Sequence, residues 1–341
     1  MKTIILDAMG TDARPNAEIL GAYQALKNNP NIILKMVGKR ALLEKKLKHF
    51  EYDPERLIIV DATDEVEMSE TPTKALKEKK NSSMAVGMRM LRQNEGDAFI
   101  SAGNTGAVMA YALVEIGRIQ SIQRPAIATI IPTPYGHTIL TDSGANADCK
   151  PIHLLHFAIM ADVYARLVFN KEKPRIGLLS NGEEKEKGNE LTKQANKLIS
   201  DTPFLNFVGN VEGRDILSGE VDVVVCDGFT GNIVLKAVES LFKFIFKLFK
   251  SEVSRHILAK IGVLFLMPSI KRILKKTDYA EFGGAPLLGV KKPVMICHGS
   301  SNEKAIKNAI LYTYKYLCND VTAELTKELK KFKTLHINEE E

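Results

Sequence analysis

The sequence predicts an α/β fold: a Rossmann-like, three-layer α/β/α arrangement around a mostly parallel sheet, with a protruding amphipathic helical hairpin. Short apolar segments alternate with longer segments whose apolar residues recur at helical spacing, the order typical of a parallel sheet. Residues 221–226, VDVVVC, are nearly all apolar, as expected of a central parallel strand buried on both faces. Residues 238–276 combine many phenylalanines and lysines in one helical pattern, which predicts the hairpin.

Strand–helix alternation begins at the N-terminus. Pro15 suits the first turn of a helix, and Thr71 and Ser82 suit the starts of two short helices, where side-chain oxygens cap backbone N–H groups. We predict strands at 3–6, 32–37 and 57–60, helices at 16–27 and 40–50, and two short helical segments between 70 and 92.

The segment 101–107, SAGNTGA, follows an apolar strand at 97–100 and leads into a helix. The first turn of a helix attracts anions, because its backbone N–H groups lack intrahelical partners and it carries the positive end of the helix dipole. Glycines let a ligand approach the backbone. The alternative is a glycine turn in which Asn104 only caps the helix. We predict an anion site here, formed by Ser101, Gly103, Asn104, Thr105 and Gly106.

A second polar turn follows two strands predicted at 126–131 and 137–141 and opens a helix at 152–169. This turn, DSGANADCKP, holds Asp142, Asn146 and Lys150, more polar groups than helix capping needs. A divalent metal site is one interpretation, but EF-hand spacing is absent and no histidine joins the set. We therefore favour the polar wall of an active site and expect no metal.

Two further polar turns follow predicted strands. The strand at 175–179 leads to residues 180–189, where Lys187 adds a positive charge beside a helix start, unless it belongs to a charged surface loop. The strand at 221–226 ends in DGFTGN, with Asp227 and Asn232. Because ligands bind beyond the carboxyl ends of parallel strands, we expect all these turns to face one shared cleft.

The hairpin region differs in kind from the rest of the chain. Its lysines and phenylalanines lie side by side on a long helical pattern, which fits a membrane interface or the acidic surface of a carrier protein. A dimer-interface helix pair is the alternative. We predict that the contact residues are Phe249, Arg255, Lys260, Leu264, Phe265, Lys271 and Arg272.

Beyond the hairpin, a strand at 294–297 and a long helix at 302–332 complete the predicted fold. Strands from both ends of the chain are expected to share one sheet system, so residues 1–336 form a single α/β body that includes the hairpin at about 238–276. An acidic tail follows at 337–341.

The composition, 45% hydrophobic and 26% charged over 341 residues, is that of an ordinary globular protein. The net charge of +6 is mild, and no basic stretch interleaved with aromatics indicates nucleic-acid binding. Four cysteines, without CxxC spacing, are expected to be buried free thiols of a reducing cytosol. The N-terminal apolar run is too short for a signal peptide. We therefore expect a cytoplasmic protein.

Several motifs, in order along nearly the whole chain, give a specific resemblance. The sequence resembles the phosphate acyltransferase family of bacterial phospholipid synthesis (acyl-ACP:phosphate transacylase, PlsX type). Thr11 departs from the family pattern, which usually has a second glycine there, and Ser180-Asn181 replaces an Asn-Ile or Asn-Val pair. The motifs are LDAMGTD, SAGNTGA, RPAI, DSGANADCKP, GEEKEKGNELT, GNVEGRD, CDGFTGN, FGGAPLLG and CHGSS.

The resemblance implies a cytoplasmic homodimer, peripherally associated with the membrane, that converts long-chain acyl-ACP (acyl carrier protein) and inorganic phosphate into acyl phosphate and free ACP. It also implies that a membrane-bound glycerol-3-phosphate acyltransferase takes the product. Phosphate is itself the nucleophile, so the protein must mainly hold it, aim it and stabilise the oxyanion, and we expect no cofactor.

Individual roles follow as hypotheses. Asn104, Thr105 and Gly106 would hold phosphate together with Lys187. Three residues would polarise the thioester carbonyl or orient its neighbours: Asn146, Lys150 and Asn232. Asp142 and Asp227 would position lysines or accept a phosphate proton. The histidines offer no convincing base, and no GxSxG elbow supports a Ser-His-Asp triad.

Three other functions stay open. A CoA-dependent phosphate acetyl- or butyryltransferase shares the chemistry, and the segment GGAPLLG is faintly similar to that class. A dehydrogenase has only fold analogy in its favour, because GxGxxG is missing after the first strand. A non-enzymatic scaffold at a lipid surface would use the hairpin but leave the polar turns unexplained.

Overall fold

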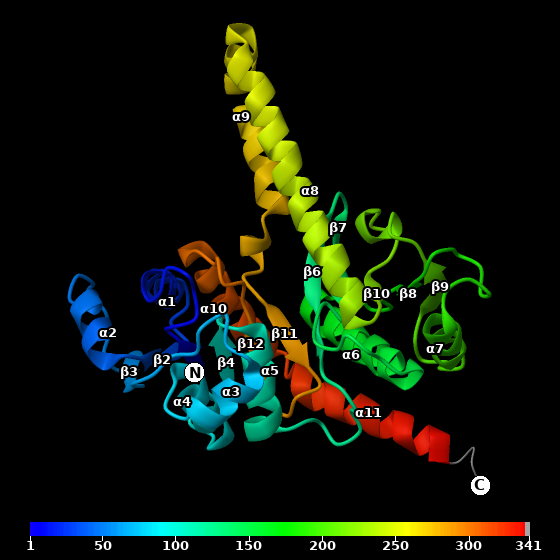
Figure 1. Ribbon diagram of the computed structural model, residues 1–341, viewed down its shortest axis with the longest axis horizontal. Coiled ribbons are helices and arrows are strands. Elements are labelled where there is room, and N and C mark those ends of the chain that lie inside the picture. The colour runs from blue at the N-terminus through cyan, green and yellow to red at the C-terminus, as the bar shows by residue number, and fades with distance from the viewer. Residues whose placement is uncertain (338–341) are drawn as a thin grey trace.

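The computed structural model describes residues 1–337, without the side chains at 276, 277, 279 and 331–337. The acidic residues Glu339–Glu341 of the predicted tail lie outside the described residues. The strands form two sheets, one of seven strands and one of five, and a long helical hairpin projects from the body between them (Figure 1).

The seven-stranded sheet has the order β3-β2-β1-β4-β12-β11-β5. Its first five strands are parallel, and β11 is antiparallel to both neighbours. Apolar residues of α1 and α10 pack on one face, and those of α4 and α5 on the other. The strands are β1 (Lys2–Asp7), β2 (Ile32–Gly38), β3 (Leu57–Asp61), β4 (Ala98–Ser101), β5 (Ala126–Ile127), β11 (Ala285–Leu288) and β12 (Val294–Ile296). The helices of this half are α1 (Asn16–Asn28), α2 (Arg40–Leu47), α3 (Pro72–Glu78), α4 (Ser83–Arg92), α5 (Thr105–Tyr111), which continues as the π-helix η1 (Ala112–Ile116), and α10 (Glu303–Cys318).

The five-stranded sheet has the order β6-β7-β10-β8-β9, with β6 antiparallel at one edge. As predicted, the all-apolar strand β10 is central, between parallel neighbours. Its strands are β6 (Thr129–Thr133), β7 (Gly136–Thr141), β8 (Ile176–Leu179), β9 (Phe207–Val211) and β10 (Val223–Val225). One face is covered by α6 (Pro151–Phe169), α7 (Glu190–Ser200) and α11 (Val321–Ile337). The short helix η2 (Asp215–Leu217) and the base of α8 pack on the other.

Within the described part of the chain, one helix, α6, is long and apolar enough to cross a membrane by length and composition. In the protein, 78% of the most apolar 18-residue stretch of α6 is buried. The leucines and alanines of α6, together with Phe157, form the centre of the core beside the five-stranded sheet. We therefore interpret α6 as a core helix.

The three-layer α/β arrangement is confirmed, but three predicted details are wrong. The predicted strand at 126–131 is divided between the two sheets as β5 and β6, because the Ile127 N–H donates to the Asp142 carboxylate and the Ile127 carbonyl accepts from the Ser143 N–H. Strands from both ends of the chain do share one sheet, because β12 pairs with β4 in the seven-stranded sheet, and β6–β10 form a second sheet. The helix predicted at 302–332 is two helices, separated at Asp320, which adopts a left-handed conformation (φ 46°). All four cysteines are free, yet Cys318 is exposed and Cys149 only half-buried.

The hairpin consists of α8 (Gly228–Arg255) and α9 (Ile257–Thr277), and the 3-10 helix η3 (Tyr279–Glu281) returns the chain to the body. It projects far from both sheets (Figure 1). Large apolar side chains are exposed near its tip, including Leu258 at 83%, Leu264 at 69% and Phe265 at 82%. The protruding amphipathic hairpin is thus confirmed.

Candidate active site

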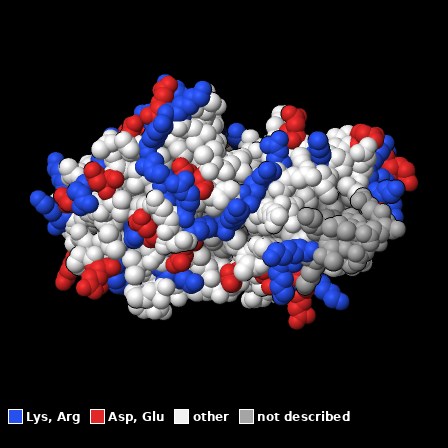
Figure 2. Space-filling view, turned by 90° about the horizontal axis from the view of Figure 1, so that it is seen from below, with Lys and Arg blue, Asp and Glu red and all other residues white. Residues whose placement is uncertain are grey.

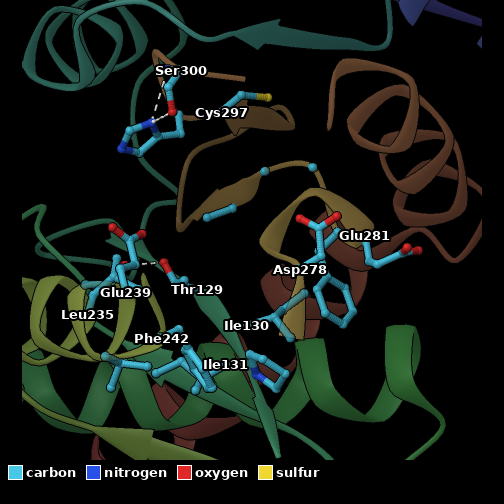
Figure 3. A pocket seen from close by; sticks show the side chains of 18 of the residues that line it. Thr129, Ile130, Ile131, Leu235, Glu239, Phe242, Asp278, Glu281, Cys297 and Ser300 are labelled. Atoms are coloured by element: carbon cyan, nitrogen blue, oxygen red, sulfur yellow. Dashed lines mark hydrogen bonds between the residues drawn. The ribbon is translucent and has the colours of Figure 1, made fainter. Parts of the chain in front are cut away.

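A cavity of about 1270 Å³ lies where the two sheets meet the base of the hairpin (Figure 3). It is lined by three of the predicted polar turns, represented by Thr105, by Ser143 with Gly144, and by Asn232. Strand β6, α8 as far as Phe246, the end of α9, the segment after β12 and the start of α10 form further parts of its walls. The cavity therefore joins polar turns from both sheets in one space.

The turn after β4 is held by its own polar side chains. The buried Ser101 hydroxyl donates to Asp7 Oδ2 (2.7 Å) and accepts from the Gly103 N–H (3.0 Å). Asn104 caps α5 by accepting from the Ala107 N–H (2.9 Å) and donates to two carbonyls of the segment before α3. Burial raises the pKa of Asp7, while hydrogen bonds from serines partly offset this. Ser101 and Asn104 thus fix the turn, and Thr105 lies on the cavity wall.

The turn after β7 is organised around the fully buried Asp142 carboxylate. Its Oδ1 accepts from the backbone N–H groups of Ile127 (3.0 Å), Gly144 (3.2 Å) and Ala145 (3.0 Å). Its Oδ2 accepts from the Asn146 backbone (2.7 Å) and side chain (2.9 Å), and Asn146 also donates to the Pro125 carbonyl (2.7 Å). Burial raises the pKa of Asp142, and these hydrogen bonds oppose the rise. Asp142 and Asn146 therefore shape the cavity floor, while Ser143 and Gly144 face the cavity.

The turn after β10 begins α8. Asp227 caps this helix by accepting from the Thr230 N–H (2.8 Å) and from the Thr230 hydroxyl (2.8 Å). Asn232, one turn further along, lines the cavity, and the position of a Cβ at Gly144 would lie 3.7 Å from Asn232 Cβ. The second and fourth polar turns thus meet at Gly144 and Asn232.

The third turn stands apart from the cavity. Lys187 is exposed on the turn after β8, beside Gly182, and it is not among the residues that line the cavity. Lys150, at the N-cap of α6, is also exposed and outside the lining. The expectation that every polar turn faces one cleft is therefore met by three turns and not by residues 180–189. The roles of Lys187 and Lys150 stay predictions.

The cavity also contains candidate site residues that the sequence did not indicate as such. An apolar wall includes Ile130 and Ile131 of β6 and the α8 side chains Leu235, Phe242 and Phe246. The spacing of residues 235, 242 and 246 puts them on one face of the hairpin helix and could have indicated this wall, but only the fold shows that β6 faces them.

Lysines surround the same space: Lys236, Lys243, Lys271, Lys275, Lys304 and Lys307. His298 and Ser300, after β12, form a hydrogen-bonded pair on the cavity wall (Figure 3).

Comparison with known proteins decides the family. A profile described as "Fatty acid synthesis protein" matches residues 2–324. A phosphate acyltransferase of Thermoanaerobacterium thermosaccharolyticum is 50% identical over 327 residues, covering 96% of this chain and 96% of that protein. The chain belongs to the phosphate acyltransferase family. A second relative in this family, from Clostridium perfringens, is 44% identical over 328 residues, 96% of this chain and 97% of its own length. The protein is thus an enzyme of the acyltransferase class.

Solved structures support the fold of this phosphate acyltransferase. EutD phosphotransacetylase from Staphylococcus aureus has a TM-score of 0.63 at 15% identity, covering 92% of this chain and 93% of its own. A phosphotransacetylase from Streptococcus pyogenes has a TM-score of 0.58 at 15% identity, covering 96% and 94%. At these identities the likeness shows the α/β fold alone.

Proposed function

We propose that this enzyme transfers a long-chain acyl group from acyl carrier protein to inorganic phosphate, releasing acyl phosphate and free carrier protein. The observation that carries the proposal is one cavity that combines polar turns, a long apolar wall and an excess of lysines. The polar turns suit phosphate, the apolar wall suits the acyl chain, and the lysines suit an acidic carrier protein.

The polar end of the cavity suits phosphate. Thr105 begins α5, whose first N–H groups and dipole favour an anion, and the Gly144–Asn232 contact lies on the same cavity wall. Attack by a phosphate oxygen on the thioester carbonyl needs a held nucleophile and donors for the developing oxyanion, rather than a covalent intermediate. Thr105 and Gly106 would hold phosphate, and Asn232 would polarise the carbonyl.

Most of the other predicted site residues hold the turns at this end of the cavity in place. Ser101, Gly103 and Asn104 shape the phosphate turn, and Asp142 with Asn146 shapes the opposite turn. Asp227 fixes the start of the helix that carries Asn232. Lys187 and Lys150 lie on turns at the carboxyl ends of β8 and β7, and we propose that the Lys187 side chain reaches phosphate when the substrates are bound.

The apolar wall suits a fatty chain. A typical site for a drug-sized molecule has a volume of roughly 300–1,000 Å³, and this cavity, at about 1270 Å³, exceeds that range. Ile131 of β6 lies on one side of the apolar wall, and Phe246 of α8 lies on the other. A short acetyl group would leave most of this surface uncovered, so the geometry favours a long-chain donor.

The lysines suit an acidic carrier protein. Among the side chains that the structure describes, three carboxylates and six lysines line the cavity, and two of the carboxylates, Asp278 and Glu281, pair with Lys304 at 2.7 Å. On the face of the body away from the hairpin, basic and acidic side chains instead lie side by side (Figure 2). A local excess of positive charge steers an acidic partner to the cavity mouth.

The exposed hairpin suits an interface. We propose that the enzyme is a cytoplasmic homodimer and that the hairpin tips contact the membrane, because Leu264 and Phe265 expose apolar surface beside Lys260 and Arg255. Phe249, Lys271 and Arg272 extend this surface toward the body. Such contact would deliver acyl phosphate, an amphiphile, to a membrane-bound glycerol-3-phosphate acyltransferase.

The test supplies the enzyme with palmitoyl-ACP and radiolabelled phosphate and separates the lipid-soluble product from free phosphate by solvent extraction. We expect labelled acyl phosphate that forms only when both substrates are present. Acetyl-CoA and butyryl-CoA serve as parallel donors, because a CoA-dependent phosphate acyltransferase shares the chemistry. Turnover with the short acyl-CoA donors and none with any acyl-ACP would overturn the proposal.

A further inference from the structure

The segment after β12 brings an ordered histidine–serine pair to the cavity. The Ser300 N–H donates to His298 Nδ1 at 3.1 Å, and the Ser300 hydroxyl oxygen lies 2.7 Å from the same nitrogen (Figure 3). Both residues line the cavity that also holds Thr105 and Asn232. Neither takes part in the function proposed above.

Backbone contacts hold this turn against the phosphate turn. The Cys297 N–H donates to the Ser101 carbonyl (2.8 Å), and the Gly299 carbonyl accepts from the Asp12 N–H (2.8 Å). A Cβ built at Gly299 would lie 2.6 Å from Met68 Cε and 3.8 Å from the Ala102 carbonyl oxygen. The segment that carries the pair therefore packs against residues 101 and 102 of the turn that leads into α5.

The two contacts to one nitrogen decide which atom is the donor. A backbone N–H can only donate, so His298 Nδ1 must offer its lone pair and carries no proton. The Ser300 hydroxyl then donates its only proton to Nδ1. Every further hydrogen bond that the Ser300 oxygen makes must therefore be one in which it accepts.

An obligate acceptor in an anion site distinguishes among anions. At neutral pH inorganic phosphate keeps at least one proton and can donate a hydrogen bond, whereas sulfate keeps none and can only accept. We propose that Ser300, locked as an acceptor by His298, is a specificity-determining residue that selects protonated phosphate over fully ionised tetrahedral anions such as sulfate. This inference rests on phosphate being the ligand of the polar end of the cavity.

The same contact would also orient the nucleophile. When the P–OH group is bound to Ser300, the unprotonated oxygens face away from it, toward the N–H donors and the thioester. A hydrogen bond that involves a charged group contributes about 1.5–3 kcal/mol, which corresponds to roughly 10- to 100-fold in affinity. Sulfate would instead place a negative oxygen against the Ser300 lone pairs and lose affinity.

Equilibrium dialysis of ³²P-phosphate and ³⁵S-sulfate against the full chain tests the inference without any acyl donor. We expect the parent to bind phosphate roughly tenfold or more tightly than sulfate. Ser300→Ala should weaken phosphate binding about 10- to 100-fold while sulfate binding stays within about twofold or improves. His298→Ala should abolish the preference, because the freed hydroxyl can donate to sulfate. His298→Asn, whose Oδ1 can accept in place of Nδ1, should restore part of it.

Ser301→Ala is the matched control. Ser301 lies in the same turn, its buried hydroxyl oxygen has no hydrogen-bond partner within the described part of the chain, and its removal should leave both affinities unchanged. Equal binding of the two anions by the parent, or unchanged phosphate affinity in Ser300→Ala, would overturn the inference. Failure of the acyl-ACP assay would instead overturn the proposed donor, so the two results are separable.

Discussion

The buried carboxylate of Asp142 gives the sharpest test of how the cavity floor is built. Substituting it by alanine removes an acceptor from five N–H groups, four of them backbone groups of Ile127, Gly144, Ala145 and Asn146. Because Asp142 follows β7 and Ile127 belongs to β5, the carboxylate also joins the two sheets.

The magnitude follows from the number of orphaned donors. Each buried N–H without a partner costs about 1–3 kcal/mol, and local relaxation with entry of water recovers part of the sum. Removing one partner of a buried charged network typically costs about 3–5 kcal/mol. We therefore expect the free energy of unfolding to fall by about 3–5 kcal/mol in Asp142→Ala.

The assay is urea unfolding followed by circular dichroism, with Asp227→Ala as the matched control. Asp227 is an aspartate at the equivalent edge of the same sheet, but it only caps α8, so its loss should cost about 1–2 kcal/mol. A loss of stability in Asp142→Ala no larger than in Asp227→Ala would refute the assignment of Asp142 as the link between the sheets.

Three further predictions concern Lys187, Glu18 and the exposed apolar residues of the hairpin. Lys187→Ala should lower kcat on the order of 10²-fold, measured as acyl phosphate formation, and near-normal turnover would remove Lys187 from the site. Burial raises the pKa of Glu18 from 4.5 to about 7, against the hydrogen bond from the Thr11 N–H. The folded state thus disfavours ionised Glu18. The contribution of neutral Glu18 to the free energy of unfolding is therefore full below pH 4.5 and is lost as the pH rises through 7. Glu18→Gln should remove this decline and be more stable than the parent by about 2–3 kcal/mol at pH 8 in urea unfolding, whereas equal pH slopes would contradict the pKa shift. Leu264→Glu combined with Phe265→Glu should abolish sedimentation with anionic liposomes and keep the circular dichroism spectrum, and unchanged sedimentation would dismiss membrane contact.

Most elements could be predicted because their signals are local. Strand β10 is apolar throughout and lies at the centre of its sheet, and Asn104 and Asp227 cap helices as their positions before apolar runs indicate. The hairpin was predictable because no other segment alternates lysine and phenylalanine over such a length.

The details that failed depend on contacts distant in sequence. Nothing local to 126–131 indicates that its first residues join β11 while the others join β7, since that switch depends on Asp142 and Ser143. The second turn does lie on the cavity wall through Ser143 and Gly144, whereas the Asp142 and Asn146 side chains are hydrogen-bonded to the backbone within and around that turn, and their site roles stay predictions.

The apolar wall and the lysines of the cavity were the largest omission. Its apolar wall combines β6 with α8, and its lysines come from both arms of the hairpin and from α10, segments up to 180 positions apart in the sequence numbering. Spacing along the chain cannot show such an enclosure, because it is created by the meeting of two sheets. The pair formed by His298 and Ser300 was visible as a motif, but its donor and acceptor roles required the geometry.

The central claim is that phosphate and a fatty chain occupy one cavity, at opposite ends. A crystal structure of the enzyme with inorganic phosphate and a non-hydrolysable thioether analogue of palmitoyl-pantetheine tests it most directly. We expect phosphate beside Thr105, Asn232 and Ser300, and the alkyl chain between Ile131 and Phe246. Phosphate bound at the turn after β8, or an alkyl chain lying outside the space between β6 and α8, would contradict the account.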